Sequence, residues 1–162
     1  MNLSKLFDMQ RALDAYIERE HGLEQADLFD KKALALLVET GELANETRCF
    51  KFWSKKGSSE QSVILEEFVD GVHFVLSLGL LLKFEQETEW TPAPPAETAT
   101  AQFLRVYEAI TQFMKEKSLA TYLMLFNDYF ALGRMLGFTA EEVEKAYIAK
   151  NEVNYRRQQQ GY

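Results

Sequence analysis

The sequence lacks several features that would assign it to a common class of protein. Cys49 is the single cysteine among 162 residues, which excludes an intramolecular disulfide and a zinc site built on cysteines. All three prolines fall between residues 92 and 95, so no proline interrupts the remainder of the chain. This cysteine usage fits a reducing intracellular compartment, and we expect a cytoplasmic protein.

No hydrophobic run is long enough to cross a membrane. The most apolar stretch, residues 72–84, is interrupted by His73, Ser77 and Lys83, and it is shorter than the roughly 20 apolar residues that a bilayer requires. The first 20 residues alternate charged and apolar side chains and do not resemble a secretory signal. We therefore expect no membrane partner and interpret residues 72–84 as part of a buried helix.

Positive charge is also scarce, because 18 Lys and Arg residues face 25 Asp and Glu residues and give a net charge of −7. A protein that binds nucleic acid without regard to sequence needs a basic surface, so we expect no nucleic-acid partner. Hydrophobic residues make up 47% of the chain and aromatic residues 13%, which excludes disorder. The length predicts one domain over residues 1–162 with a substantial core.

Apolar residues recur at helical spacing through almost the whole chain. The pattern predicts helices over residues 3–20, 30–53, 60–82, 99–116, 119–136 and 140–160. Ser4 and either Ser58 or Ser59 are candidate N-caps, and Thr139 with Glu142 has the spacing of a capping box. The proline-rich segment 84–100 is a loop. The fold class is therefore all-α, a single-domain bundle of about five to six helices.

Two pairs of carboxylates stand out within this pattern. Glu39 and Glu42 form the first pair, and Glu67 and Asp70 form the second after a gap of 24 residues. Residues three apart lie on one helix face, roughly one turn from each other. The first pair alone would more often be a solvated acidic face. The second pair interrupts an apolar helix, where buried carboxylates require a partner. Hard divalent cations with oxygen ligands are the natural partners, and Mg²⁺ is the foremost candidate.

Three other segments carry polar residues that could have either a functional or a purely structural role, and the residues alone do not decide between the two. Lys51, Trp53 and Lys55 suit a phosphate and base contact, but the end of a helix whose lysines reach solvent explains them equally well. Near the C-terminus, Lys150, Asn154 and Arg157 share one helix face, as basic residues in the last turns of a helix often do. His73, one turn beyond Asp70, is by itself more often a hydrogen-bonded core residue.

Taken together, these motifs resemble the all-α nucleoside triphosphate pyrophosphatases, the MazG-like superfamily, and within it the dimeric dUTPase family. The carboxylate pairs indicate the superfamily. The dUTPase branch is indicated by further positions along nearly the whole chain: Gln10, the segment Cys49–Ser54, the segment Asp70–Phe74, and Lys150, Asn154, Arg157, Gly161 and Tyr162. No departure occurs at the acidic positions, but the connection after Phe84 is short and rich in proline, so any lid there differs.

The resemblance implies an enzyme that hydrolyses dUTP, and dUDP as well, to dUMP by attack of water on the β-phosphorus. It assigns Glu39, Glu42, Glu67 and Asp70 to two or three Mg²⁺ ions, for which Mn²⁺ can substitute, and makes Glu42 the residue that orients or deprotonates the water. The remaining assignments are to the substrate. Basic residues would bind the phosphates: Lys51, Lys55, Lys150 and Arg157. Gln10 and Asn154 would bond the uracil edge, Trp53, Phe74 and His73 would contact the base and sugar, and Tyr162 is the last residue of the matching C-terminal motif.

The family also implies a homodimer, and the aromatic content expected of the fourth and fifth helices suggests a subunit interface. Two alternative functions remain open. A related pyrophosphatase would act on another nucleotide, such as dCTP or a modified deoxynucleotide. A helical interaction module without catalysis would use the acidic residues only for structural cations or for a partner.

Overall fold

The computed structural model describes residues 1–88 and 93–162. It contains six helices: α1 (Leu3–Glu20), α2 (Phe29–Thr47), α3 (Gln61–Leu81), α4 (Ala99–Glu116), α5 (Leu119–Met135) and α6 (Ala140–Gln159). These two segments contain no strand. The predicted all-α class and the predicted number of helices are therefore confirmed.

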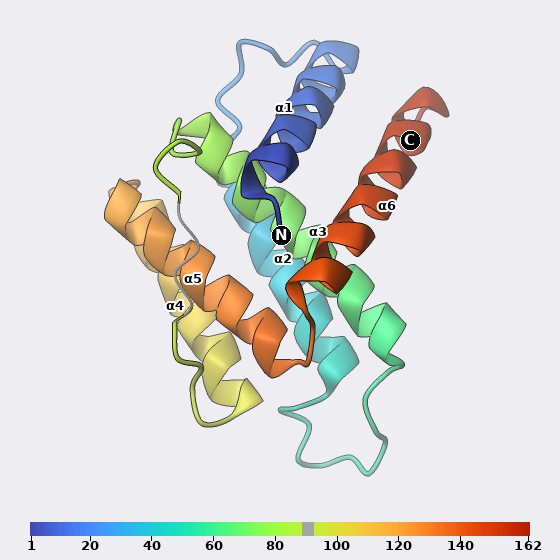
Figure 1. Cartoon of the computed structure of the whole chain (residues 1–162), viewed down its shortest axis with the longest axis vertical. Coiled ribbons are helices and arrows are strands. Elements are labelled where there is room, and N and C mark those ends of the chain that lie inside the picture. Colours follow the sequence, from blue (N-terminus) through green and yellow to red (C-terminus); the bar gives the residue numbers. More distant parts are fainter. Residues whose placement is uncertain (89–92) are drawn as a thin grey trace.

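Helix α3 is the centre of the bundle and packs against α1, α2, α5 and α6. Figure 1 shows α1 and α6 lying over α3 and diverging toward one end, while α4 and α5 form a pair alongside. The central position explains the sequence of α3, which is apolar on most of its surface and buries eleven residues. The few polar side chains on this helix are consequently held between neighbouring helices.

A close contact between α3 and α5 fixes how these helices pack. A Cβ atom at Gly71 would lie only 1.8 Å from the hydroxyl oxygen of Tyr129, so only glycine fits there. The buried Tyr129 hydroxyl donates a hydrogen bond to the backbone oxygen of Phe68 at 2.9 Å. Because Gly71 directly follows Asp70, this contact also sets the position of the second carboxylate pair.

The aromatic residues of α4 and α5 lie mainly in the core, including Phe113, Tyr122 and Phe126. Of the large hydrophobic residues on these two helices, Leu104 and Met124 are exposed. The aromatic content of the two helices is therefore accounted for by packing within one chain. It does not indicate a subunit interface.

Helix α2 ends six residues earlier than the sequence predicts. Arg48 adopts a left-handed conformation with φ 57° and its N–H donates to the oxygen of Ala44. The Arg48 guanidinium then bonds the backbone oxygen of Lys56 and the hydroxyl of Ser54, which organises the following loop. The predicted helix to residue 53 is wrong, and residues 48–60 form a connection.

Two of the predicted N-caps are also wrong. Asn2, not Ser4, caps α1 by accepting a hydrogen bond from the N–H of Lys5. Helix α3 starts after Glu60 without a side-chain cap, because the hydroxyl of Ser59 is engaged by Glu46. The capping box of Thr139 and Glu142 at the start of α6 is confirmed.

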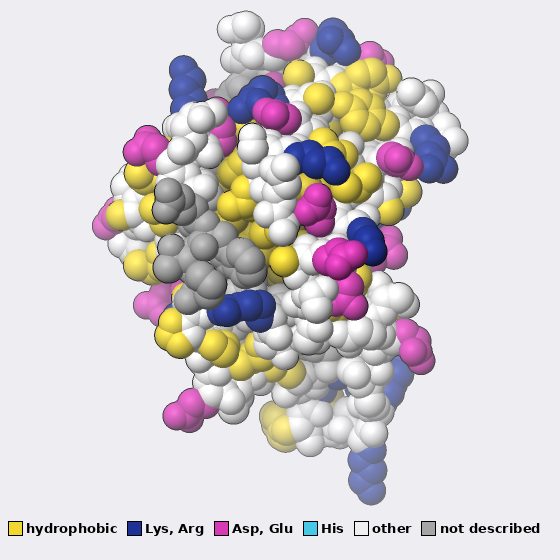
Figure 2. All heavy atoms as spheres, viewed as in Figure 1, with side chains coloured by type: hydrophobic (Ala, Val, Ile, Leu, Met, Phe, Trp, Pro, Cys, Tyr) yellow, Lys and Arg dark blue, Asp and Glu magenta, His cyan; other side chains and the backbone are white. Residues whose placement is uncertain are grey.

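Within the described ranges, no helix has both the length and the hydrophobicity that crossing a membrane requires. Figure 2 shows side chains of both charges scattered over one face of the molecule, with hydrophobic surface between the far ends of α1 and α6. The rings of Tyr16 and Tyr155 on these two helices lie 5.3 Å apart.

Candidate active site

The two carboxylate pairs meet where α2 packs against α3. One oxygen from each of Glu39, Glu67 and Asp70 lies within 4.8 Å of the others. Glu42 is exposed one turn beyond Glu39 and is not one of these three, but its negative charge raises the pKa values of Glu39 and Glu67. The fold therefore brings three acidic side chains from two helices together, with Glu42 beside them.

The ionised form of the carboxylates in this cluster is disfavoured by burial and by their mutual repulsion. Burial, together with the negative charges of Asp70 and Glu42, raises the pKa of Glu39 to about 7. Burial also raises the pKa values of Glu67 and Asp70, and for Glu67 the charge of Asp70 adds to the effect. These groups compete for protons because too little positive charge faces them.

Lys150 from α6 supplies one positive charge beside the cluster. Its ammonium group is almost buried and lies 2.8 Å from both Asp70 and Glu66. Burial opposes the charged form, but the hydrogen bonds to Asp70 and Glu66 outweigh it, so the pKa of Lys150 is raised. One ammonium group cannot neutralise this number of carboxylates, so the remaining negative charge favours the binding of divalent cations.

A cavity of about 350 Å³ opens next to the cluster, between α1, α2, α3 and α6. Eight of the residues predicted to form the site line it: Gln10, Glu39, Asp70, His73, Phe74, Asn154, Arg157 and Tyr162. Residues from both ends of the sequence and from its middle are thus assembled around one space. The cavity combines acidic, amide and aromatic groups, as a site for a polar ligand with a ring would.

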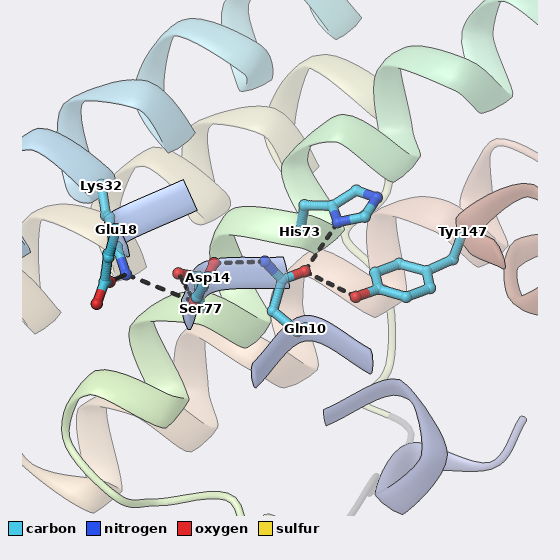
Figure 3. Close-up of polar contacts among 7 residues, drawn as sticks. All are labelled: Gln10, Asp14, Glu18, Lys32, His73, Ser77 and Tyr147. Atoms are coloured by element: carbon cyan, nitrogen blue, oxygen red, sulfur yellow. Dashed lines mark hydrogen bonds and ion pairs between the residues drawn. The ribbon is translucent and has the colours of Figure 1, made fainter. Parts of the chain in front are cut away.

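A hydrogen-bonded chain of side chains runs along the wall of this cavity (Figure 3). The hydroxyl of Tyr147 and Nδ1 of His73 both contact the amide oxygen of Gln10, at 2.7 and 2.8 Å. The amide nitrogen of Gln10 donates to Asp14 at 2.8 Å. Asp14 in turn accepts from Ser77 at 2.5 Å. The chain holds the buried Gln10 side chain in one position.

His73 is kept neutral by its surroundings. Burial, together with the positive charge of Lys150, lowers its pKa to about 3. The imidazole ring stacks on Tyr147 with 4.2 Å between ring centroids. Among the described residues, no partner reaches its Nε2 atom. A neutral ring with one bonded nitrogen can position an amide without adding charge to the cavity.

The family model described as dUTPase matches residues 2–162. The chain belongs to the dUTPase family. Its all-α architecture is that of the all-α branch of the family, and the match over nearly the full length identifies an enzyme that hydrolyses dUTP. No curated protein matches the chain.

The C-terminal end of this dUTPase closes one side of the cavity. Asn154 is half-buried there, and its side-chain amide has no hydrogen-bond partner among the described residues. The guanidinium of Arg157 lies 5.3 Å from the ring centroid of Tyr162. Its charge also favours ionised Asp70. Arg157 is therefore placed between the carboxylate cluster and the aromatic end of the cavity.

Six predicted residues do not line the cavity of this dUTPase: Glu42, Glu67 and Lys150 lie at the carboxylate cluster beside it, and Lys51, Trp53 and Lys55 lie elsewhere. Lys51, Trp53 and Lys55 lie on the connection 48–60, where Trp53 is 65% exposed. The Trp53 ring packs edge-on against Phe50 and Phe52, and the Lys51 ammonium lies 5.6 Å from the Phe50 ring. Their assignment to the substrate remains a prediction.

The site also uses residues that the sequence analysis did not select: Asp14, Lys32, Glu66, Ser77 and Tyr147. Helical spacing offered a signal for most of them. Asp14 follows Gln10 by four residues, and Glu66, Asp70, His73 and Ser77 form one polar stripe along α3. Lys32 has no such signal, because it lies on a different helix from the carboxylate that it pairs with.

The donor set of the cluster fits a divalent cation. Glu39, Glu67 and Asp70 offer only carboxylate oxygens, which are the ligands preferred by Mg²⁺ and Mn²⁺ and are poorly suited to softer metals. Members of this dUTPase family use divalent metal in general. Glu42 is not one of these three, but its negative charge raises the pKa of Glu39, so it lies beside the cluster.

Proposed function

We propose that this dUTPase is a Mg²⁺-dependent dUTP diphosphatase that keeps uracil out of DNA. It converts dUTP and water to dUMP and pyrophosphate, and it converts dUDP and water to dUMP and phosphate. The observation that carries the proposal is the convergence of Glu39, Glu67 and Asp70 beside a cavity that also holds amide and aromatic groups. The choice of dUTP as the nucleotide rests on the family match.

We assign Glu39, Glu42, Glu67 and Asp70 to two or three Mg²⁺ ions, which Mn²⁺ can replace. When bound, these ions polarise the phosphate oxygens and lower the pKa of an attached water. Glu42 is the most exposed of these four carboxylates, and its negative charge raises the pKa of Glu39. It is therefore best placed to accept a proton from the attacking water or to orient it.

The phosphate chain is assigned to the basic residues around the cluster. Arg157 lines the cavity near Asp70 and can donate two parallel hydrogen bonds to phosphate oxygens. Lys150 is already hydrogen-bonded to Asp70, so it positions this carboxylate and places a charge beside the phosphates. Lys51 and Lys55 would reach the phosphates from the connection 48–60.

The base and the sugar are assigned to the opposite side of the cavity. Gln10 and Asn154 present amide groups to the uracil edge, and His73 supports Gln10 through their hydrogen bond. Phe74 packs on the sugar, where its ring leaves no space for a 2′-hydroxyl, while Tyr162 and Trp53 pack on the base. A buried amide that is held rigidly rejects a base with the reverse hydrogen-bond pattern.

We also propose that the enzyme is a homodimer in the cytoplasm. The exposed hydrophobic residues Leu34 and Val38 on α2 and Leu104 on α4 support an interface on this side of the bundle. The hydroxyl of Tyr107 on α4 donates to the backbone oxygen of Leu37 on α2, so these helices are neighbours. Light scattering coupled to gel filtration tests the dimer, and a monomeric mass at micromolar concentration would refute it.

A nucleotide panel tests the function. Pyrophosphate and phosphate release is measured for dUTP, dUDP, dCTP, dTTP and UTP, with Mg²⁺, with Mn²⁺ and with excess chelator. We expect turnover of dUTP and dUDP only, and only with metal. Preference for dCTP would support the related pyrophosphatase instead. Absence of any turnover, together with no thermal stabilisation by nucleotide and Mg²⁺, would support the interaction module.

The position of attack can be tested in the same preparation. If water attacks the β-phosphorus, hydrolysis of dUTP in ¹⁸O-labelled water places the label in pyrophosphate and leaves dUMP unlabelled. Label in dUMP would show attack on the α-phosphorus and would remove the reason to expect dUDP as a substrate.

A further inference from the structure

The buried Gln10 side chain has almost no hydrogen-bonding capacity left. Its amide oxygen accepts from Tyr147 at 2.7 Å and from Nδ1 of His73 at 2.8 Å, which occupies both lone pairs. Its amide nitrogen donates one N–H to Asp14 at 2.8 Å. No second acceptor for this nitrogen exists among the described residues. Since Gln10 lines the cavity, one N–H donor is what it can offer a ligand.

The orientation of this amide depends on Asp14. A carboxylate only accepts hydrogen bonds, so the side of the Gln10 amide that faces Asp14 must be the nitrogen. If the amide were turned over, its oxygen would face the carboxylate and the two would repel. Asp14 is held in place by the hydroxyl of Ser77 at 2.5 Å and by the ammonium of Lys32 at 3.5 Å (Figure 3).

We propose that Asp14 is a positioning residue that sets base specificity by fixing which atom of the Gln10 amide faces the bound base. The proposal rests on the proposed role of Gln10 at the uracil edge. A single N–H donor pairs with a carbonyl oxygen such as O4 of uracil. Cytosine carries an amino group at the same position, so two donors would face each other and the complex would lose a hydrogen bond.

The same orientation also fixes the tautomer of His73. Because the Gln10 oxygen faces the imidazole, Nδ1 must carry the proton, and Nε2 is left without one. If the amide turned over, its N–H would face Nδ1 and favour the opposite tautomer. The tautomer of His73 is therefore a spectroscopic report on the orientation of Gln10, and it can be read without any substrate.

The test compares Asp14→Asn with Asp8→Asn, a matched change on the exposed side of the same helix, where Asp8 pairs with Arg11. In Asp14→Asn the new amide can present either atom, so Gln10 is no longer held in one orientation. We expect the ratio of kcat/KM for dUTP to that for dCTP to fall by at least about tenfold, mainly through a higher KM for dUTP. Asp8→Asn should retain the wild-type ratio.

Imidazole ¹⁵N NMR spectra provide the second readout. The chain has two histidines, and a His21→Gln background leaves one signal set from His73. The wild type should show protonated Nδ1 and unprotonated Nε2, whereas Asp14→Asn should show a mixture. Ser77→Ala removes the hydrogen bond from the Ser77 hydroxyl to Asp14. It should shift both the selectivity ratio and the His73 tautomer in the same direction as Asp14→Asn, but by a smaller amount. This variant replaces Asp14→Asn in the test if Asp14→Asn does not fold.

The outcomes separate this inference from the proposed function. If the wild type does not discriminate dUTP from dCTP, the proposed function fails before Asp14 is considered. If the wild type selects dUTP, and the folded Asp14 and Ser77 variants keep both its selectivity and its His73 tautomer, the inference is wrong. A loss of selectivity with an unchanged tautomer would also overturn it, because the effect would then not pass through Gln10.

Discussion

Along α3, the polar stripe passes from the carboxylate cluster around Asp70 to the hydrogen-bonded chain around His73 and Ser77, and these two regions differ in how their polar groups are satisfied. In the cluster, burial and repulsion raise the pKa values of Glu39, Glu67 and Asp70. In the chain, Gln10 has partners on both sides of its amide. The carboxylates of the cluster lack balancing positive charge, whereas most polar atoms of the chain have a partner; among the described residues, one N–H of Gln10 and Nε2 of His73 do not.

This difference indicates that the two regions have different functional roles. A site that must bind and release cations and a phosphate chain benefits from unbalanced charge, because the incoming ions relieve repulsion. A site that must distinguish bases benefits from rigid groups with a fixed number of donors. The following predictions test this contrast, beginning with the largest expected effect.

Removal of one carboxylate should nearly abolish turnover. Asp70→Asn is expected to lower kcat for dUTP by about a thousandfold or more, because it removes a cation ligand and the partner of Lys150. Steady-state kinetics with pyrophosphate detection measures the change. Glu116→Gln, an exposed position at the end of α4, is the control. Activity of Asp70→Asn within tenfold of wild type would refute the assignment.

Acidification should destabilise the hydrogen-bonded chain through His73. Its folded pKa of about 3 lies below the unfolded value of 6.5, so the unfolded state binds a proton first as the pH falls. The stabilisation is fully present above pH 6.5 and decreases from there toward pH 3. We expect a loss of about 2 kcal/mol between pH 6.5 and pH 5.

Urea unfolding of the wild type and of His73→Gln at both pH values isolates this effect, because the change at Glu39 is common to both proteins. The variant should lose about 2 kcal/mol less than the wild type on acidification. His21→Gln changes an exposed histidine and should behave as the wild type does. Equal pH dependence in all three proteins would mean that His73 titrates normally in the folded state.

Rejection of the ribose nucleotide should depend on Phe74. The half-buried ring lines the cavity, and Phe74→Ala is expected to raise kcat/KM for UTP relative to dUTP by about tenfold, as space for a 2′-hydroxyl appears. Competition between the two nucleotides gives this ratio directly. If the variant rejects UTP as strongly as the wild type, another group must read the sugar.

The smallest effect is expected on the stability of the metal-free protein. Burial and repulsion raise the pKa of Glu39 from 4.5 to about 7, so this group destabilises the fold progressively as the pH rises through that window. At pH 8 with chelator, Glu39→Gln should be more stable than wild type by roughly 1 kcal/mol. With excess Mg²⁺ the order should reverse. A less stable variant under both conditions would show that the cluster is not repulsive.

The sequence predicted the helices and the carboxylate cluster because both depend on local spacing. The pairs at three-residue intervals necessarily share a helix face, and the apolar surroundings of Glu67 and Asp70 required their burial. Contacts between helices were not predictable in this way. The pairing of Asp14 with Lys32 and the partners of Gln10 depend on how α1, α2 and α6 pack, which no spacing within one helix defines.

The early end of α2 shows a second limit. The apolar and aromatic residues that follow Thr47 continue the composition of a helix, but Arg48 in a left-handed conformation ends it, and its bonds to Ser54 and Lys56 hold the turn. The family resemblance selected Lys51 and Trp53, yet the structure places both outside the cavity. The sequence therefore indicated which residue types belong to the site more reliably than it indicated where each residue lies in the fold.

The central claim is that opposed carboxylates on α2 and α3 bind divalent cations. Titration of the protein with Mn²⁺, followed by electron paramagnetic resonance of the free ion, tests it without substrate. We predict that wild type and Asp8→Asn bind Mn²⁺ alike, whereas Glu67→Gln and Asp70→Asn bind it at least about tenfold more weakly. Equal binding by all four proteins would contradict the account.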